Sequence, residues 1–361
     1  MPWVQRMAPY TPPEDLDALA RRTGRTVDDI VKLDANENPY GCSLRVADAL
    51  ARYQHFHWYT DPDQKVLREA VAAYAGVPPD TIVLGNGSDE LIDLLCRTFL
   101  RPGDEIIDCT PTFGMYRFSA ELCGAIPIDV PRTEDWHVDV DGVRAAISPR
   151  TRMIFVASPN NPTGTWEPTE TVQALQDLGP VLVLDEAYVE FSAHRSRVSL
   201  VEAGQNLVVL RTFSKWAGLA GLRVGYGVFP REIVSTLMKI KPPFNVNRAA
   251  EIAVLATLED VEAVNATVTA IIEERDRMAR ALGRIEGIRS WPSEGNFVLV
   301  EAADGSPRRL YDHLVSRGIL VRTYAHGRLT HAVRISAGRP EHTNALVAAV
   351  DEWSEMRGTH D

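Results

Sequence analysis

Short apolar segments recur along the middle of the chain, and most of them carry apolar residues at consecutive rather than alternate positions. Six such segments lie at 81–84, 105–109, 152–157, 181–184, 206–210 and 224–229. Consecutive apolar residues in a strand face both sides of a sheet, so this pattern predicts strands buried on both faces. Helical stretches follow several of the segments. The sequence therefore predicts a mainly parallel α/β sheet covered by helices.

The two ends of the chain have different patterns. Residues up to about 32 are rich in Pro, Arg and Asp, which predicts an arm with one short helix. After the break at Lys241-Pro-Pro-Phe, a helical pattern runs from about 248 to 282, and strand-like runs follow at 297–301, 319–322 and 333–336. We expect three parts: an arm (1–32), a large domain (33–245) and a smaller C-terminal α+β domain (246–361).

Composition and charge narrow the possible partners. The chain has 361 residues, of which 45% are hydrophobic, and a formal net charge of -11. Its size allows a substantial core. The negative charge argues against nucleic acid or an anionic membrane as a partner. A small anion remains possible, because a local cluster of arginines can override the overall sign.

The cysteine spacing and the lengths of the apolar stretches indicate in which cellular compartment the protein is expected. Cys42, Cys96, Cys109 and Cys123 form no CxxC pair and no metal-ligand spacing, which is typical of reduced thiols. The first twenty residues contain no apolar core of a secretory signal. No stretch approaches the about 18 uninterrupted apolar residues of a membrane span. We expect a cytoplasmic protein without a metal site.

Polar residues follow the apolar segments at the points where parallel strands end, which is where α/β sheets place their chemistry. Lys215 follows segment 206–210, and a lysine with a lowered pKa can form a Schiff base with an aldehyde cofactor. Asp185 follows segment 181–184, and a buried carboxylate suits a protonated pyridine nitrogen. Taken alone, Lys215 could be a solvated surface residue and Asp185 a helix N-cap.

Other strand ends offer ligands for the rest of such a cofactor. Asn161 and Tyr188 could hydrogen-bond a ring oxygen, although a turn asparagine and a core tyrosine are equally ordinary. Gly87 and Ser88 begin a predicted helix, where backbone N–H groups attract phosphate, although Ser88 could be a simple N-cap. Ser214 and Arg223 could be two further phosphate ligands, and the Phe113 ring could stack on the flat face of the cofactor. The combination predicts pyridoxal phosphate (PLP).

The motifs resemble those of a known family. SPNNPTG (158–164), DEAY (185–188), TFSK (212–215) and AGLRVGY (220–226) resemble the fold-type I PLP transferases, in particular the aminotransferases. KLDANENPYG (32–41), GNGSDELI (85–92), PTFGMY (111–116) and RTFSKWAGLAGLRVGYG (211–227) are similar to the histidinol-phosphate aminotransferase family. The resemblance covers nearly the whole chain in the same order.

The resemblance implies a role for each position. Lys215 would carry the cofactor and move a proton at the substrate α-carbon. Asp185 would bind the pyridine nitrogen, and Asn161 and Tyr188 the ring oxygen. Phe113 would stack on the ring. The phosphate would be held by the backbone of Ser88 and Asp89 together with Ser214 and Arg223.

The resemblance also implies the substrates and the assembly. The reaction would transfer an amino group from L-glutamate to imidazole-acetol phosphate, giving L-histidinol phosphate and 2-oxoglutarate. Arg322 and Arg334 would bind the substrate anion, and Asn36 would also contact the substrate. The enzyme would be a homodimer with shared sites. Tyr59 would reach the neighbouring subunit's cofactor phosphate and Tyr10 its substrate phosphate.

Alternatives on the same fold are an aromatic amino-acid aminotransferase and a decarboxylase of a phosphorylated amino acid. A PLP-sensing transcription regulator would need a basic DNA-binding domain, and the segment before Asp34 is too short for one. The chain departs from the family pattern at Trp216, where smaller residues are common beside the lysine. Phe113 stands where tyrosine is also frequent, and Thr110 where a second proline is often seen. None of these departures removes a chemical role.

Overall fold

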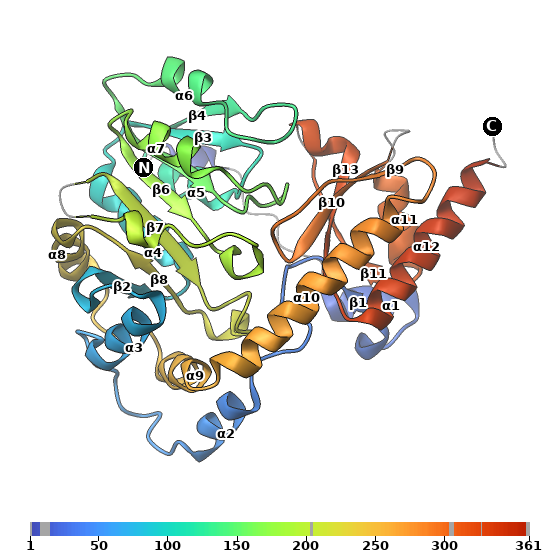
Figure 1. The fold of residues 1–361 in the computed structure, drawn as a ribbon, viewed down its shortest axis with the longest axis horizontal. Helices are drawn as coiled ribbons and strands as arrows, with labels where there is room; N and C mark the ends of the chain where they lie inside the picture. The colour runs from blue at the N-terminus through green and yellow to red at the C-terminus, as the bar shows by residue number, and fades with distance from the viewer. Residues whose placement is uncertain (1, 8–14, 203–204, 303–306, 326, 359–361) are drawn as a thin grey trace.

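The computed structural model of the protein describes residues 2–7, 15–202, 205–302, 307–325 and 327–358. Its central feature is a seven-stranded sheet with the strand order β2-β8-β7-β6-β5-β3-β4 (Figure 1). The strands are β2 (Ile82–Gly85), β3 (Glu105–Thr110), β4 (Ile126–Pro131), β5 (Thr151–Ala157), β6 (Val181–Asp185), β7 (Leu207–Thr212) and β8 (Gly225–Val228).

The strand directions confirm the predicted mainly parallel α/β sheet. The pairs β3–β4, β3–β5, β5–β6 and β6–β7 are parallel, and only β8 runs antiparallel to its two neighbours, β7 and β2. The apolar pattern does not predict β4, because this edge strand is largely exposed and contains Pro127 and Pro131. A proline is tolerated at a sheet edge, where one side of the strand needs no partner.

Alternate residues of the central strands bury into two separate cores, as strands covered on both faces must. In β5, Met153 and Phe155 pack with α4, α5 and α8, whereas Ile154 and Val156 pack on the opposite face. The helices on the first face are α4 (Ser88–Phe99), α5 (Met115–Leu122) and α8 (Arg231–Ile240). Those on the second are α3 (Lys65–Ala75), α6 (Val140–Ala146), α7 (Thr169–Gln176) and α9 (Arg248–Leu258).

The helical pattern predicted over 248–282 forms two helices, α9 and α10 (Val261–Leu282). The break falls at Asp260, whose backbone φ of -127° leaves the helical region. Apolar periodicity continues across this point, so periodicity alone does not reveal the break. Helix α10 joins the two halves of the molecule: Val264 and Ile271 pack in the core of the large sheet, and Met278 and Leu282 in that of the smaller one (Figure 1).

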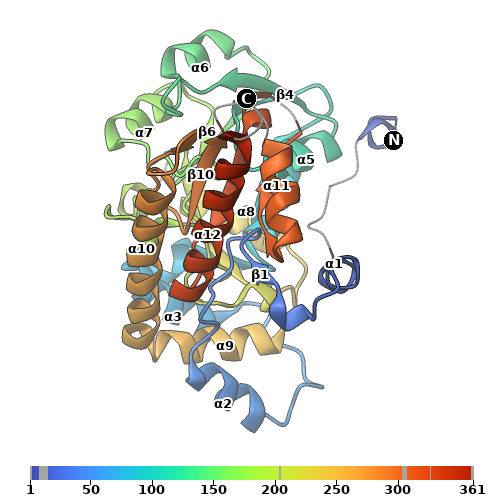
Figure 2. The same ribbon diagram turned by 90° about the vertical axis from the view of Figure 1, so that its right-hand side faces the viewer.

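The smaller sheet has the order β12-β13-β10-β9 and is antiparallel throughout. Helices α10, α11 and α12 lie together beside it (Figure 2). Its elements are β9 (Ile288–Ser290), β10 (Phe297–Ala302), β12 (Arg322–Thr323), β13 (Ala332–Ser336), α11 (Pro307–Ser316) and α12 (Pro340–Gly358). This arrangement agrees with the α+β character expected for the C-terminal part.

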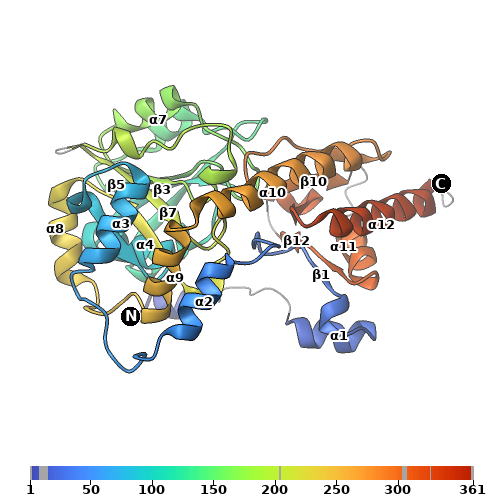
Figure 3. The same ribbon diagram turned by 60° about the horizontal axis from the view of Figure 1, so that its bottom comes forward.

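The N-terminal segment is tied to the smaller sheet. After α1 (Leu16–Thr23), the strand β1 (Val31–Lys32) pairs in parallel with β11 (Ile319–Leu320). The run predicted as one strand at 319–322 is therefore divided, since β11 pairs with β1 and β12 with β13. Helix α2 (Leu44–Arg52) then packs on α9 (Figure 3). The division into parts at residues 32 and 245 stays a prediction.

Candidate active site

A cavity of about 430 Å³ opens where the carboxyl ends of β3, β5, β6 and β7 meet the start of α4. Arg322 of β12 and Arg334 of β13 also line it. It brings together most of the residues predicted from the sequence: Ser88, Asp89, Phe113, Asn161, Asp185, Tyr188, Ser214, Lys215, Arg223, Arg322 and Arg334. Asp185 and Lys215 lie at or just beyond strand ends of the large sheet, where the sequence placed them, while their chemical roles stay predictions.

Lys215 lies three residues beyond the end of β7, in the loop that leaves the sheet. Its Nζ donates a hydrogen bond to the carbonyl oxygen of Ala35 at 3.0 Å. Burial, with a further contribution from the positive charge of Arg334, lowers the pKa of Lys215 to about 8. About a tenth of the amine is therefore uncharged at neutral pH, far more than for an ordinary lysine, and only the uncharged amine is a nucleophile.

Asp185 is the last residue of β6, and only 4% of its surface is exposed. Its Oδ2 accepts a hydrogen bond from the Tyr116 hydroxyl at 2.7 Å, and its Oδ1 accepts one from the Ala187 N–H at 3.0 Å. Burial raises the pKa of Asp185 to about 6 although both hydrogen bonds oppose the rise. Among the described residues no basic side chain forms an ion pair with it, so this carboxylate suits a cationic ligand group.

Two side chains on the cavity wall are fixed by partners from the smaller domain and from segment 34–36. Asn161 Oδ1 accepts a hydrogen bond from an Arg334 Nη at 2.7 Å. The other Nη of Arg334 donates to the Asp34 carbonyl. Tyr188 Oη accepts from Asn36 Nδ2 at 3.1 Å. Burial raises the pKa of Tyr188 to about 12, so its phenol stays protonated at neutral pH.

Close backbone packing shapes the end of the cavity at the start of α4. A Cβ at Gly87, whose φ is +80°, would lie 2.6 Å from the Arg223 guanidinium, and one at Gly225 would lie 2.6 Å from the Ser88 backbone nitrogen. Only glycine allows both approaches. An Arg223 Nη lies 2.9 Å from Asp89 Oδ2. A helix N-terminus, a guanidinium and the buried Ser214 hydroxyl form a donor set that fits a phosphate.

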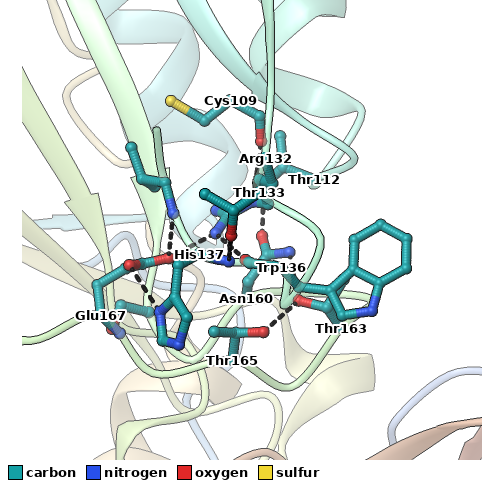
Figure 4. A network of polar contacts seen from close by, with 12 residues as sticks. Cys109, Thr112, Arg132, Thr133, Trp136, His137, Asn160, Thr163, Thr165 and Glu167 are labelled. Atoms are coloured by element: carbon teal, nitrogen blue, oxygen red, sulfur yellow. Dashed lines mark hydrogen bonds and ion pairs between the residues drawn. The ribbon is translucent and has the colours of Figure 1, made fainter. Parts of the chain in front are cut away.

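A hydrogen-bond network supports the loops that carry Phe113 and Asn161 (Figure 4). The side chain of Asn160 joins the two loops: its Nδ2 donates to the Pro111 carbonyl at 3.1 Å, and its Oδ1 accepts from Thr112 Oγ1 at 2.7 Å. Phe113 is half-buried and lines the cavity. The centre of its ring lies 5.6 Å from that of Tyr116, in an edge-to-face arrangement. The Asn160 side chain therefore ties the two loops together through neutral hydrogen bonds.

The same network contains a fully buried ion pair (Figure 4). Arg132 and Glu167 lie 2.6 Å apart, and neither side chain has any exposed surface. Arg132 also donates to the carbonyls of Cys109 and Trp136, each at 3.0 Å. The Glu167 N–H donates to Ser158 Oγ at 2.9 Å, in the loop that carries Asn161. The pair thus connects the ends of β3 and β5 beneath the cavity.

Two predicted residues, Tyr59 and Asn36, do not line the cavity, and a third lies outside the described residues. Tyr59 is 78% exposed and stacks on Phe244, with the ring centres 4.4 Å apart. The Asn36 side chain is buried among protein partners. Tyr10 lies outside the described residues. Trp216 is fully buried, and its ring stacks on Tyr74 rather than lining the cavity.

The cavity also includes residues that the sequence reasoning did not select. Tyr116 contacts Asp185 directly, and its place in the PTFGMY motif is a signal that could have found it. Tyr324 follows Arg322 by two residues, on the same side of the cavity. Ala35 contributes only a carbonyl oxygen, which no side-chain pattern can reveal.

The donor set fits PLP at each of its functional groups. A phosphate would meet Arg223, Ser214 and the start of α4, and a protonated ring nitrogen would meet Asp185. An aldehyde would meet the Lys215 amine, whose pKa is lowered. In the described part of the chain, no group of three or more His, Cys, Asp or Glu residues is arranged to hold a metal ion. None of the described helices has the length and apolar character that crossing a membrane requires.

Comparisons with known proteins agree with this chemistry. The family model for class I and II aminotransferases matches residues 28–350. The chain is 48% identical to a histidinol-phosphate aminotransferase of Roseiflexus castenholzii, over 97% of both chains. It is 43% identical to the chloroplastic histidinol-phosphate aminotransferase of Nicotiana tabacum, over 98% of this chain and 86% of that one.

A solved structure gives the same result. The histidinol-phosphate aminotransferase of Sinorhizobium meliloti in complex with PLP superposes with a TM-score of 0.89 and 29% identity, covering 99% of this chain and 97% of that one. Fold, cavity and sequence therefore lead to one assignment. The chain belongs to the class I and II aminotransferases, which are PLP-dependent enzymes, and within them to the histidinol-phosphate aminotransferase family.

Proposed function

We propose that the protein transfers an amino group between L-glutamate and imidazole-acetol phosphate, giving L-histidinol phosphate and 2-oxoglutarate in histidine biosynthesis. The observation that carries the substrate assignment is the pairing of Arg322 with Arg334 on adjacent strands. Both side chains line the cavity that contains Lys215. Two guanidiniums suit either a phosphate or the distal carboxylate of glutamate, so one pocket can receive both substrates in turn.

Each residue of the site has a separate role in the proposed reaction. Bound PLP supplies an electrophilic carbon for the substrate amine and a protonated ring that withdraws electrons from the α-carbon. Asp185 would keep the ring nitrogen protonated, and Asn161 and Tyr188 would hydrogen-bond the ring oxygen. The Lys215 amine, with its lowered pKa, would move a proton at the substrate α-carbon.

The remaining residues orient the reactants. Arg223, Ser214 and the first N–H groups of α4 would hold the cofactor phosphate, and Phe113 would stack on the ring. Arg322 and Arg334 would hold the substrate anion. Because one pocket would receive the two substrates in turn, we expect ping-pong kinetics.

The substrate assignment is tested by comparing kcat/KM for L-histidinol phosphate and L-phenylalanine, each with 2-oxoglutarate. We expect the phosphorylated substrate to be preferred. A preference for phenylalanine of about tenfold or more would contradict the proposal and favour an aromatic aminotransferase. Carbon dioxide release from a phosphorylated amino acid would instead favour a decarboxylase.

The proposal includes a homodimer with shared sites. Phe56, Trp58, Tyr59 and Phe244 are all large apolar residues with at least 41% of their surface exposed. Large exposed apolar side chains close together favour a protein interface. Tyr59 is then free to reach the partner's cofactor phosphate. The proposed role of Tyr10 at the partner's substrate remains part of this proposal, as does a cytoplasmic location, which the four free thiols support.

Mixed dimers test the sharing of sites. Lys215→Ala and Tyr59→Ala subunits should each be impaired alone. In a hybrid, one site carries both changes and the other carries neither. After random exchange of subunits, about a quarter of the sites should be intact, and activity should return to that level. If mixing restores no activity although native mass spectrometry shows hybrids, Tyr59 acts within its own subunit.

A further inference from the structure

Asn36 lies at the centre of a buried chain of hydrogen bonds that joins three distant parts of the sequence. Only 1% of its surface is exposed, and its φ of 53° lies in the left-handed region, which asparagine tolerates better than most residues. Its backbone N–H donates to Ser336 Oγ at 2.9 Å, and its Oδ1 accepts from the same hydroxyl at 3.0 Å. Its Nδ2 donates to Tyr188 Oη at 3.1 Å.

The hydrogen bonds in this chain have one consistent set of directions. The backbone N–H of Asn36 can only donate, so Ser336 Oγ accepts there. Among the described residues, the Ser336 hydroxyl proton meets an acceptor only at Asn36 Oδ1, so the hydroxyl donates to it. The amide oxygen is therefore fixed on the side of Ser336, and Nδ2 must face Tyr188. Since Nδ2 can only donate, the Tyr188 oxygen accepts from it, and the hydroxyl proton of Tyr188 must point elsewhere.

We propose that Asn36 and Ser336 are positioning residues, which direct the Tyr188 hydroxyl proton into the cavity as a donor to the ring oxygen of PLP. This inference rests on the proposed role of Tyr188 at that oxygen. The family resemblance implied that Asn36 contacts the substrate. Its side-chain amide instead forms hydrogen bonds with Ser336 and Tyr188, so we assign it a positioning role.

The chain of bonds also links the two ends of the active site. Ser336 lies on β13, two residues beyond Arg334, which is placed at the substrate anion. A small displacement of β13 on binding an anion would therefore reach Tyr188 through Asn36. The charged groups that act on Tyr188 are Arg334 and Asp185, and the phenol remains protonated at neutral pH, as a donor must.

The direct test is a spectroscopic pH titration of the PLP-loaded protein without substrate. A hydrogen bond donated to the ring oxygen favours its negative form, and therefore lowers the pH at which the absorbance of the lysine-bound cofactor changes. Asn36→Gly removes the amide but accepts the left-handed backbone. We expect it to raise the midpoint by about 0.5 to 1 pH unit, the size of one net hydrogen bond. Ser336→Ala should act in the same direction by a smaller amount.

Two comparisons separate positioning from a general loss of order. Tyr188→Phe should raise the midpoint on its own, and Asn36→Gly should add no further rise in that background. Asn296→Ala is the matched control, because Asn296 Nδ2 donates to the Asn36 carbonyl at 3.0 Å without entering the chain. It should lower the melting temperature and leave the midpoint in place.

Each outcome has one meaning. An unchanged midpoint in Asn36→Gly, or in Ser336→Ala if the first variant does not fold, overturns the inference when Tyr188→Phe shifts it. An equal shift in Asn296→Ala also overturns it. If Tyr188→Phe shifts nothing, the proposed role of Tyr188 fails instead, while the transamination assay remains an independent test of the enzyme.

Discussion

The two ends of the active-site cavity are built in different ways. The cofactor end consists mainly of residues at or just beyond the ends of buried strands: Asp185 ends β6 and Lys215 follows β7, whereas Arg223 precedes β8. The substrate end consists of Arg322 and Arg334 on short strands of the smaller sheet. Arg334 and its neighbour Ser336 are held against segment 34–36 by hydrogen bonds to Asp34 and Asn36, about 300 positions away in the sequence.

This difference indicates that one end of the cavity determines the cofactor chemistry and the other determines substrate binding. Residues at strand ends are placed by the sheet itself, so the cofactor end keeps its geometry as long as the large sheet is folded. The substrate end depends on how the smaller sheet and segment 34–36 sit against the large sheet. Changes at the first end should abolish the chemistry, whereas changes at the second should alter substrate binding and leave the cofactor in place.

Lys215→Ala should give the largest effect, a loss of activity of about 10⁴-fold, because both covalent attachment and proton transfer are lost. The visible absorbance of lysine-bound PLP should disappear with it. Lys241→Ala is a suitable control, since Lys241 is also buried but donates to backbone carbonyls outside the cavity. A Lys215→Ala protein that keeps the visible band would contradict the assignment of the lysine.

Glu167→Gln should destabilise the protein by about 3 kcal/mol, because Arg132 would remain buried without its counter-charge. The free energy of unfolding in urea measures this effect. Asp141→Asn breaks the exposed Asp141–Arg144 pair and should cost less than about 1 kcal/mol. Similar costs in the two variants would mean that the buried pair does not stabilise the loops of the cofactor end.

Arg334→Lys should lower kcat/KM by about 100-fold for both glutamate and histidinol phosphate, since lysine keeps the charge but loses the fork that holds an anion. The visible absorbance of bound PLP should persist. The comparison between the two ends fails if this variant loses its cofactor. Arg322→Lys should be the milder change, and kinetics with both substrates would rank the two arginines.

The smallest expected effect is on how the rate of PLP attachment to Lys215 depends on pH. The pKa of Lys215 is lowered to about 8, so the uncharged amine becomes more abundant as pH rises towards that value and levels off above it. The rate at which added PLP attaches to the cofactor-free protein should rise about tenfold per pH unit below this pKa. In Arg334→Ala the nearby positive charge is gone, and the midpoint should move upward. A midpoint near the ordinary pKa of lysine in the unaltered protein would rule out this account.

Apolar periodicity located positions at the cofactor end, whereas Arg322 and Arg334 at the substrate end were chosen only from the family resemblance, and the difference has a physical reason. Asp185 and Lys215 follow apolar runs, and the end of a parallel strand is a place that periodicity can locate. Asn36, Ser336 and Ala35 take their roles from hydrogen bonds between distant segments. No local pattern reports which residues 300 positions apart will meet.

The larger sheet shows the same limit. Its buried strands were predictable from consecutive apolar residues, but β4 was not, because an exposed edge strand with two prolines has no such run. The break between α9 and α10 was also missed, since the apolar residues continue on both sides of Asp260. The strands whose burial shows as a run of apolar residues were predicted correctly. The edge strand β4 and the break between α9 and α10 leave no such local signal, and only the structure revealed them.

The pairing of segment 34–36 with β13 has a consequence for the order in which the protein matures. Ser336 and Asn36 are 300 residues apart, so the ribosome releases one of them long before the other is made. The large sheet can fold while synthesis continues, but Asn36, which donates to Tyr188, gains its Ser336 partner only when the C-terminal strand has been made. A nascent chain should therefore become competent to bind PLP correctly only near the end of translation.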